Sequence, residues 1–339
     1  MRSPPCFGNH LRTPFEISAS VSSHVQGAKF YCMIMSLTTI GSYIGFPLGF
    51  LVFLYMMISY KKRKNIQGKV VLITGANSGL GKECAKAFHQ AKCRVLLCGR
   101  NREALQALKE ELTNAKVPST HQAEIVVLDL EKLSSIPQCI ADAVRIHGHI
   151  DIVINNAGLS YRGQIEDTSL DVDIKLMTVN YFAQIALIKA VLPYMKSQQN
   201  GSIVNISSIQ GKFAIPYRSA YTASKHAIQS FSDSLRAEVD NIHVCVVSPA
   251  YIQTNLSKNA VCGDGSKYGL MDKTTQSGMA PSYVAEKILS AVEFEQNEVI
   301  LSPVHHKIAI YLRTIVPNLF FKLMKSRAKS GKKDYEKKD

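Results

Sequence analysis

Short runs of apolar residues alternate with longer, helix-patterned segments through most of the chain after residue 68. The runs lie at residues 69–74, 94–99, 124–129, 151–154, 202–207, 243–248 and 298–301. Strands that read as continuous Val, Ile and Leu are buried on both faces, and helix-length spacers between them require crossover connections. The pattern therefore predicts an α/β fold with a doubly wound parallel sheet, a Rossmann fold.

A different pattern precedes this domain. Residues 31–60 carry no charge and are mostly apolar, which is long enough to cross a hydrocarbon core of about 30 Å. We predict one N-terminal transmembrane helix there, and the basic run that follows favours a cytosolic catalytic domain. The expected organisation is a tail (1–30), the transmembrane helix (31–60), a basic linker (61–68), the Rossmann domain (69–302), and a basic amphipathic segment with its tail (303–339).

Charge and cysteine content narrow the class of protein. The formal net charge is +14, and much of it lies in residues 61–64 and 322–339. Two basic patches that flank a mildly basic domain indicate an anionic membrane surface as a partner, and without a recognition motif we expect no nucleic acid. The eight cysteines form no CxxC pair and have no metal-ligand spacing with histidine, so we predict free thiols and no metal site.

The first predicted strand runs into a glycine-rich loop, Thr74–Gly81, which opens into a helical pattern. Glycines there let the backbone approach a pyrophosphate, whose charge the N–H groups of the helix start stabilise. The second strand ends in Cys98-Gly99-Arg100. A cation at that end suits a ribose 2′-phosphate, so NADP(H) is favoured over NAD(H).

Tyr221 and Lys225 are four residues apart in a predicted helix, so both side chains face a common ligand. We expect the ammonium, together with an oxidised nicotinamide ring, to lower the pKa of the tyrosine and let it exchange a proton with substrate oxygen. Ser208, just past the strand at 202–207, is predicted to hold the carbonyl oxygen, because its neighbour Ser207 faces the other way.

These motifs, in this order, resemble the short-chain dehydrogenase/reductase family: the glycine loop, Asn155-Asn156-Ala157-Gly158, Ser208 and YxxxK. The resemblance covers about residues 65–301 and implies a catalytic tetrad in which Asn180 holds a water that links Lys225 to solvent. It also implies that the cofactor is bound by Gly75, Ser78, Leu80, Gly81, Arg100, Asp129, Asn156, Tyr221, Lys225 and Thr254. One departure is Pro249-Ala250, where the family usually has Pro-Gly, and it weakens the assignment of Thr254.

Four further segments, 161–163, 207–212, 218–227 and 264–272, resemble one branch of the family. That branch is associated with endoplasmic reticulum and peroxisomal membranes and reduces acyl- or alkyl-dihydroxyacetone phosphate in ether lipid synthesis. The resemblance implies a lipid-like carbonyl or alcohol substrate, with Arg162 and Arg218 either near its phosphate or simply on the surface. A hydroxysteroid or retinoid substrate, and a cofactor-bound scaffold without turnover, are the alternatives.

Two expectations concern association. Residues 305–324 are apolar with interspersed Lys and Arg, which predicts either an interfacial helix on a membrane or a helix docked on the domain. Family resemblance implies a homo-oligomer formed through the helices near 168–196 and 219–240.

Overall fold

The computed structural model describes residues 45–47, 49–54, 62–115 and 121–336, with side chains as far as residue 330. The chain divides into two compact units, Met1–Lys62 and Arg63–Asp339. The second unit contains all seven strands of the large sheet described below, both hydrophobic cores and the cleft, so it holds a complete fold.

The larger sheet of the described chain has seven strands in the order β3-β2-β1-β4-β6-β7-β9, and every neighbouring pair is parallel. Its strands are β1 (Val70–Thr74), β2 (Arg94–Gly99), β3 (Glu124–Val127), β4 (Ile152–Asn155), β6 (Gly201–Ile206), β7 (Ile242–Pro249) and β9 (Glu298–Leu301). The chain winds from β1 to one edge and from β4 to the other. The doubly wound parallel sheet predicted from the sequence is confirmed.

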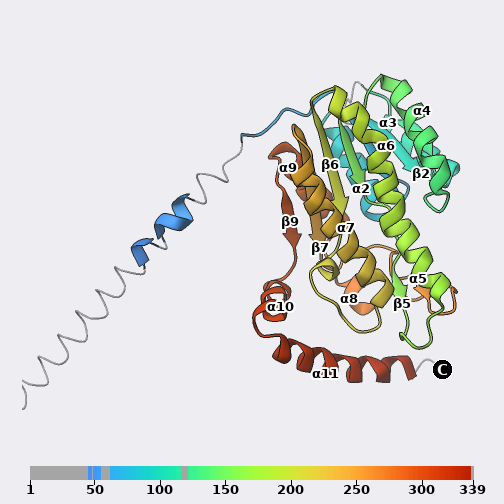
Figure 1. Ribbon diagram of the computed structural model, residues 1–339. Helices are drawn as coiled ribbons and strands as arrows, with labels where there is room; N and C mark the ends of the chain where they lie inside the picture. The colour runs from blue at the N-terminus through green and yellow to red at the C-terminus, as the bar shows by residue number, and fades with distance from the viewer. Residues whose placement is uncertain (1–44, 48, 55–61, 116–120, 337–339) are drawn as a thin grey trace, which may run out of the picture. The chain divides into compact units, whose positions relative to one another are not determined.

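Helices cover both faces of this sheet (Figure 1). One face packs on α2 (Gly79–Gln90), α3 (Arg102–Thr113) and α9 (Pro281–Glu293). The other face packs on α4 (Ile136–His147), α6 (Ala183–Ser197) and α7 (Ser219–Glu238). Alternate residues of β1 enter the two cores, Val71 on one side and Leu72 on the other, as the two-residue period of a strand requires.

Elements at the carboxyl ends of the strands complete the domain. A two-stranded parallel sheet pairs β5 (Tyr161–Arg162) with β8 (Val261–Cys262), and α8 (Lys273–Gln276) follows it. A helix bent by a π turn at Thr178–Phe182 joins α5 (Leu170–Met177) to α6. After β9 come α10 (Val304–Ile315) and α11 (Pro317–Glu336), which cross the same end of the domain (Figure 1).

The predicted membrane-spanning segment, residues 31–60, falls mostly outside the described residues. Its described part contains a short apolar helix, Gly45–Leu54, on which Phe46, Phe50 and Phe53 are exposed. Among the described residues, one helix is long and apolar enough to cross a membrane, Leu170–Ser197, and 44% of its most apolar window is buried inside the domain. That helix supplies Leu187, Ile188 and Val191 to a core of the domain.

Candidate active site

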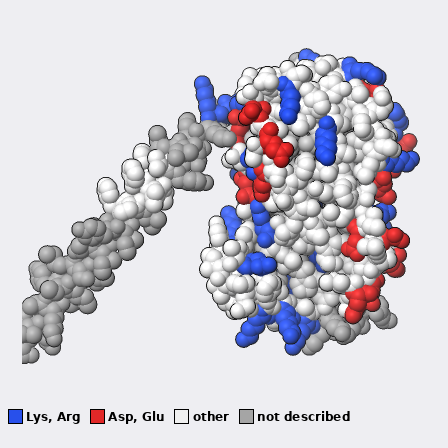
Figure 2. Space-filling model, in the orientation of Figure 1, with Lys and Arg blue, Asp and Glu red and all other residues white. Residues whose placement is uncertain are grey.

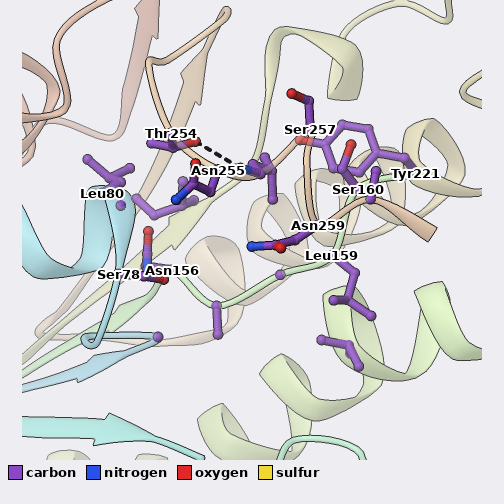
Figure 3. A pocket seen from close by; sticks show the side chains of 18 of the residues that line it. Ser78, Leu80, Asn156, Leu159, Ser160, Tyr221, Thr254, Asn255, Ser257 and Asn259 are labelled. Atoms are coloured by element: carbon purple, nitrogen blue, oxygen red, sulfur yellow. Dashed lines mark hydrogen bonds between the residues drawn. The ribbon is translucent and has the colours of Figure 1, made fainter. Parts of the chain in front are cut away.

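A cleft of about 700 Å³ opens at the carboxyl ends of β1, β4, β6 and β7. It includes the point between β1 and β4 where the chain reverses its winding direction, which is where ligands bind in open α/β sheets. Figure 3 shows Ser78, Leu80 and Asn156 on one side of the cleft, and Tyr221, Ser160 and Ser257 on the other. The described lining therefore joins the predicted cofactor loop to the predicted catalytic tyrosine.

The glycine loop is shaped for close backbone approach. Gly75 has φ of +65°, in the left-handed region that favours glycine. A Cβ at Gly81 would lie 2.2 Å from the carbonyl oxygen of Gly75, so no side chain fits there. The loop places the amino-terminal end of α2 at the cleft, where Ser78 is exposed and its hydroxyl does not cap its own helix. This end of α2 suits a pyrophosphate.

A hydrogen-bond network fixes the next segment to the glycine loop. The Thr74 hydroxyl accepts hydrogen bonds from the backbone N–H groups of Asn156 and Ala157, each at 3.0 Å. The Asn156 side-chain amide donates to the Thr74 carbonyl oxygen at 2.9 Å. The Asn-Asn-Ala-Gly motif thus holds the end of β4 against the end of β1, and Asn156 lies at the floor of the cofactor side.

The adenosine end of the cleft carries a charge pair that sequence reasoning missed. Arg100 is largely exposed and donates to Glu131 at 3.1 Å, and Lys175 lies 3.6 Å from the same carboxylate. Asp129 also lines the cleft, and its side chain accepts a hydrogen bond from the backbone of Glu131 at 3.1 Å. The group therefore contains two cations, Arg100 and Lys175, and two carboxylates, Asp129 and Glu131.

Tyr221, Ser208 and Lys225 converge on the other side. Tyr221 and Lys225 lie on the first turns of α7, both are buried, and the Lys225 ammonium is 5.7 Å from the centre of the Tyr221 ring. The Ser208 side chain is close enough to Tyr221 to lower its pKa, and its hydroxyl accepts from the Gln210 N–H at 3.1 Å. The Ser207 hydroxyl instead donates to the backbone carbonyl of Lys225 at 3.1 Å, so it is occupied away from the tyrosine.

Burial shifts the pKa values of Tyr221 and Lys225 in opposite directions. Burial raises the pKa of Tyr221, and the Ser208 side chain and the charges of Arg162 and Arg218 only partly offset that increase. The same burial lowers the pKa of the Lys225 ammonium to about 8. The lowered pKa of Tyr221 that the sequence predicts for the site with an oxidised nicotinamide ring stays a prediction.

Asn180 is fully buried in the π turn, behind the catalytic group. Its side chain accepts from the Leu159 N–H at 2.7 Å, donates to the Leu159 carbonyl at 2.8 Å and donates to Ser224 at 3.0 Å. These contacts occupy the amide, so the side chain of Asn180 positions the loop after β4. A water held by Asn180 stays a prediction.

The Pro-Ala departure is accommodated without strain. Ala250 does not have a positive φ, and its N–H donates to the Leu301 carbonyl at 2.8 Å. Thr254 reaches the glycine loop, where its side chain would lie 3.2 Å from a Cβ built on Gly79. The structure thus brings Thr254 to the cofactor side of the cleft, as the sequence predicts.

A buried group of charges borders the substrate side. Arg162 lines the cleft, is 5% exposed, and donates to Asp272 through Nε at 3.0 Å. Arg218 reaches the same carboxylate at 3.4 Å. Two guanidinium groups therefore share one carboxylate, and both arginines lie close enough to Tyr221 to lower its pKa.

Asp272 and Glu131 are the site residues that sequence reasoning missed. Each is distant in sequence from the arginine that it binds, and neither belongs to a motif. For Asp272, the sequence offered one indication: it lies in the segment DGSKYGLMD, which resembles one branch of the family.

Comparison with known proteins defines the class. Residues 69–263 match the sequence model of the family described as short chain dehydrogenase, which is more than half of the chain. The chain belongs to the short-chain dehydrogenase/reductase family and is an NAD(P)-dependent oxidoreductase.

Within the family, the chain is similar to proteins named Dehydrogenase/reductase SDR family member 7B. It is 51% identical to that of Bos taurus over 277 residues, covering 80% of this chain and 85% of the relative. It is 48% identical to that of Danio rerio over 301 residues, covering 87% and 97%. The resemblance to a particular branch of the family is thereby confirmed.

Solved structures agree in fold. A short-chain dehydrogenase from Streptomyces avermitilis superimposes with a TM-score of 0.65 at 30% identity, covering 77% of this chain and 97% of that one. One from Sphingobium yanoikuyae, solved in complex with NADPH, has a TM-score of 0.60 at 27% identity, covering 68% and 87%.

Proposed function

We propose that this chain reduces the ketone of a phosphorylated lipid, of the acyl- or alkyl-dihydroxyacetone phosphate type, to an alcohol with NADPH. The observation that carries the substrate class is the pair of arginines that shares Asp272 beside Tyr221. A phosphate needs a cation near the reacting ketone, and a planar guanidinium binds two of its oxygens at once. A steroid or retinal carries no such anion.

The catalytic groups divide the chemistry between them. A nicotinamide held in the cleft would supply the hydride. Ser208 holds the carbonyl oxygen beside Tyr221, and Tyr221 gives its proton to that oxygen as it becomes a hydroxyl. The neighbouring Lys225 ammonium stabilises the phenolate that remains.

The preference for NADPH rests on Arg100. Its guanidinium follows β2 directly, lines the cleft and is largely exposed, and Lys175 lies beside the same carboxylate, Glu131. A 2′-phosphate at the end of β2 would be attracted to these cations.

For localisation, we propose single-pass attachment to the endoplasmic reticulum or peroxisomal membrane. The uncharged residues 31–60 and the basic run that follows support it. A homo-oligomer also stays a proposal, supported by the exposed apolar side chains of Leu170 and Ile174 on α5 and Phe182 in the π turn.

The test measures NADPH oxidation by the full chain in detergent with acyl-dihydroxyacetone phosphate, its unphosphorylated counterpart, a 3-ketosteroid and retinal. We expect the phosphorylated ketone to have the highest kcat/KM. Arg162→Met should raise its KM by about tenfold or more, because a charge-assisted contact is lost, and leave the unphosphorylated ketone little changed. Arg145→Met, at an exposed ion pair, is the matched control.

Two outcomes contradict the proposal in different ways. If the steroid or retinal is reduced faster and Arg162→Met affects all substrates alike, the reductase chemistry stands and the substrate class is wrong. If the folded protein binds NADPH and reduces none of the panel, the chain is a scaffold.

A further inference from the structure

The outward face of α10 is an exposed apolar stripe. Val304, Ile308, Tyr311 and Ile315 follow one another at spacings of four, three and four residues, which places them on one side of a helix. Their exposed fractions are 72%, 58%, 67% and 73%. The opposite side of α10 packs on the domain through Ala309, Ile310 and Leu312. The helix is therefore docked on the domain and still presents a second apolar face to solvent.

Exposed apolar side chains also occur on α11, on both sides of a buried one. Leu319, Phe321 and Leu323 are about half exposed, whereas Phe320 between them is buried against Ile209 and Phe213. The Arg313 guanidinium lies 4.8 Å from the centre of the Phe321 ring, so the two helices share a cation–π contact at their junction. We call the seven exposed apolar side chains of the two helices the α10–α11 surface: Val304, Ile308, Tyr311, Ile315, Leu319, Phe321 and Leu323.

The charged residues of α10 and of α11 as far as residue 330 are all basic. No acidic residue occurs between Glu298 and Asp334, and the same stretch contains eight Lys and Arg. Those with described side chains are Lys307, Arg313, Lys322, Lys325, Arg327 and Lys329. Figure 2 shows blue side chains among uncoloured atoms at the lower end of the domain, where α10 and α11 lie. An apolar stripe bordered by cations fits the headgroup boundary of an anionic bilayer.

The surface adjoins the mouth of the cleft. The Tyr217 hydroxyl donates to the Ala328 carbonyl of α11 at 2.9 Å, and Arg327 donates to the Tyr251 hydroxyl at 3.4 Å. Tyr251 lines the cleft, and Ile209, which contacts Phe320, directly follows the catalytic Ser208. A membrane bound to this surface would lie next to the substrate side of the cleft.

We propose that the α10–α11 surface binds an anionic phospholipid bilayer, independently of residues 31–60, and sets the mouth of the cleft at the lipid boundary. A second copy of the chain is a poorer occupant, because symmetric pairing would bring two uniformly basic surfaces together. A bilayer rich in anionic lipid has an apolar interior that can bury the exposed apolar side chains, and negatively charged headgroups that attract the Lys and Arg residues. A lipid ketone would then enter the cleft from the membrane.

The test uses the unit that begins at Arg63, which contains the complete sheet and both cores and omits residues 31–60. Its sedimentation is measured with vesicles of phosphatidylcholine alone and of phosphatidylcholine containing one quarter phosphatidylserine. We expect binding to the anionic vesicles that weakens as salt is raised, and little binding to the neutral ones. The triple variant Ile308→Ser, Tyr311→Ser, Ile315→Ser should lower the affinity by roughly tenfold or more.

A matched triple variant removes exposed apolar side chains elsewhere on the domain: Val127→Ser, Ile146→Ser, Tyr283→Ser. It should bind as the parent does. Equal thermal midpoints and equal NADPH affinity establish that both variants are folded.

The proposal is overturned if the parent fails to bind anionic vesicles, or if the α10 variant binds them as well as the parent. It is also overturned if the α10 variant changes only the oligomeric state measured by light scattering. That result would assign the surface to contacts between copies of the chain.

Discussion

The two sides of the cleft are built differently. The cofactor side is formed by short loops at the ends of β1 and β4, where Gly81 allows backbone to touch backbone and Thr74 ties the loops together. The substrate side is formed by segments distant in sequence, which are joined by ion pairs such as that of Arg162 with Asp272. The cofactor side thus depends on local backbone geometry, whereas the substrate side depends on long-range charge contacts.

The largest expected effect on NADPH binding comes from adding a side chain at Gly81, where two backbone segments of the cofactor side are in closest contact. In Gly81→Val, even the Cβ would lie 2.2 Å from the Gly75 carbonyl oxygen. This oxygen belongs to the backbone, which cannot move aside as easily as the end of a flexible side chain. We expect loss of measurable NADPH binding, followed by fluorescence titration, and a lower thermal midpoint. If Gly81→Val binds NADPH as the parent does, the backbone contact at Gly81 is not required for cofactor binding.

The substrate side is sensitive to removal of its shared carboxylate. Asp272→Asn leaves two mostly buried guanidinium groups without their charge partner, and breaking a buried pair costs about 3–5 kcal/mol. We expect the free energy of unfolding in urea to fall by an amount near the lower end of that range. Asp142→Asn, which breaks an exposed pair with Arg145, should change it by about 0.5 kcal/mol or less. Equal effects of the two variants would remove the distinction between the buried and exposed pairs.

The pH dependence of kcat for ketone reduction tests Tyr221 and Lys225, which lie where the two sides of the cleft meet. Burial lowers the pKa of Lys225 to about 8 and raises that of Tyr221. Below pH 8 the ammonium is present and the tyrosine is protonated. As pH rises through 8 the ammonium is lost, so kcat for ketone reduction should fall by about tenfold per pH unit. Lys225→Arg retains the charge and should lack this alkaline limb, even if its rate is lower. A flat profile from pH 7 to 9 in the parent would contradict the assignment.

The smallest effect concerns the choice of cofactor. Arg100→Ala should reduce the ratio of kcat/KM for NADPH to that for NADH by roughly tenfold, because an exposed cation contributes modestly to phosphate binding. Arg102→Ala, at the start of α3, is the control. A higher kcat/KM for NADH than for NADPH in the parent protein would contradict the proposed preference for NADPH.

The contrast between the two sides also explains what the sequence could predict. The glycine loop and the Tyr221–Lys225 spacing are local, so the residues that act together are close in the sequence. The β5–β8 pair could not be predicted, because two-residue strands carry no periodicity. The pairing of Arg100 with Glu131 and of Arg162 with Asp272 depends on how distant segments pack, and so does the burial that raises the pKa of Tyr221.

The central claim is that Tyr221 delivers the proton at the junction of the two sides. Its most direct test is Tyr221→Phe in the full chain, with NADPH affinity and NADPH oxidation measured on the same preparation. The account predicts nearly unchanged affinity, because the ring is retained, and a fall in kcat of about 10²–10⁴-fold, because the proton donor is lost. Ketone reduction at close to the parent rate by the folded variant would contradict it.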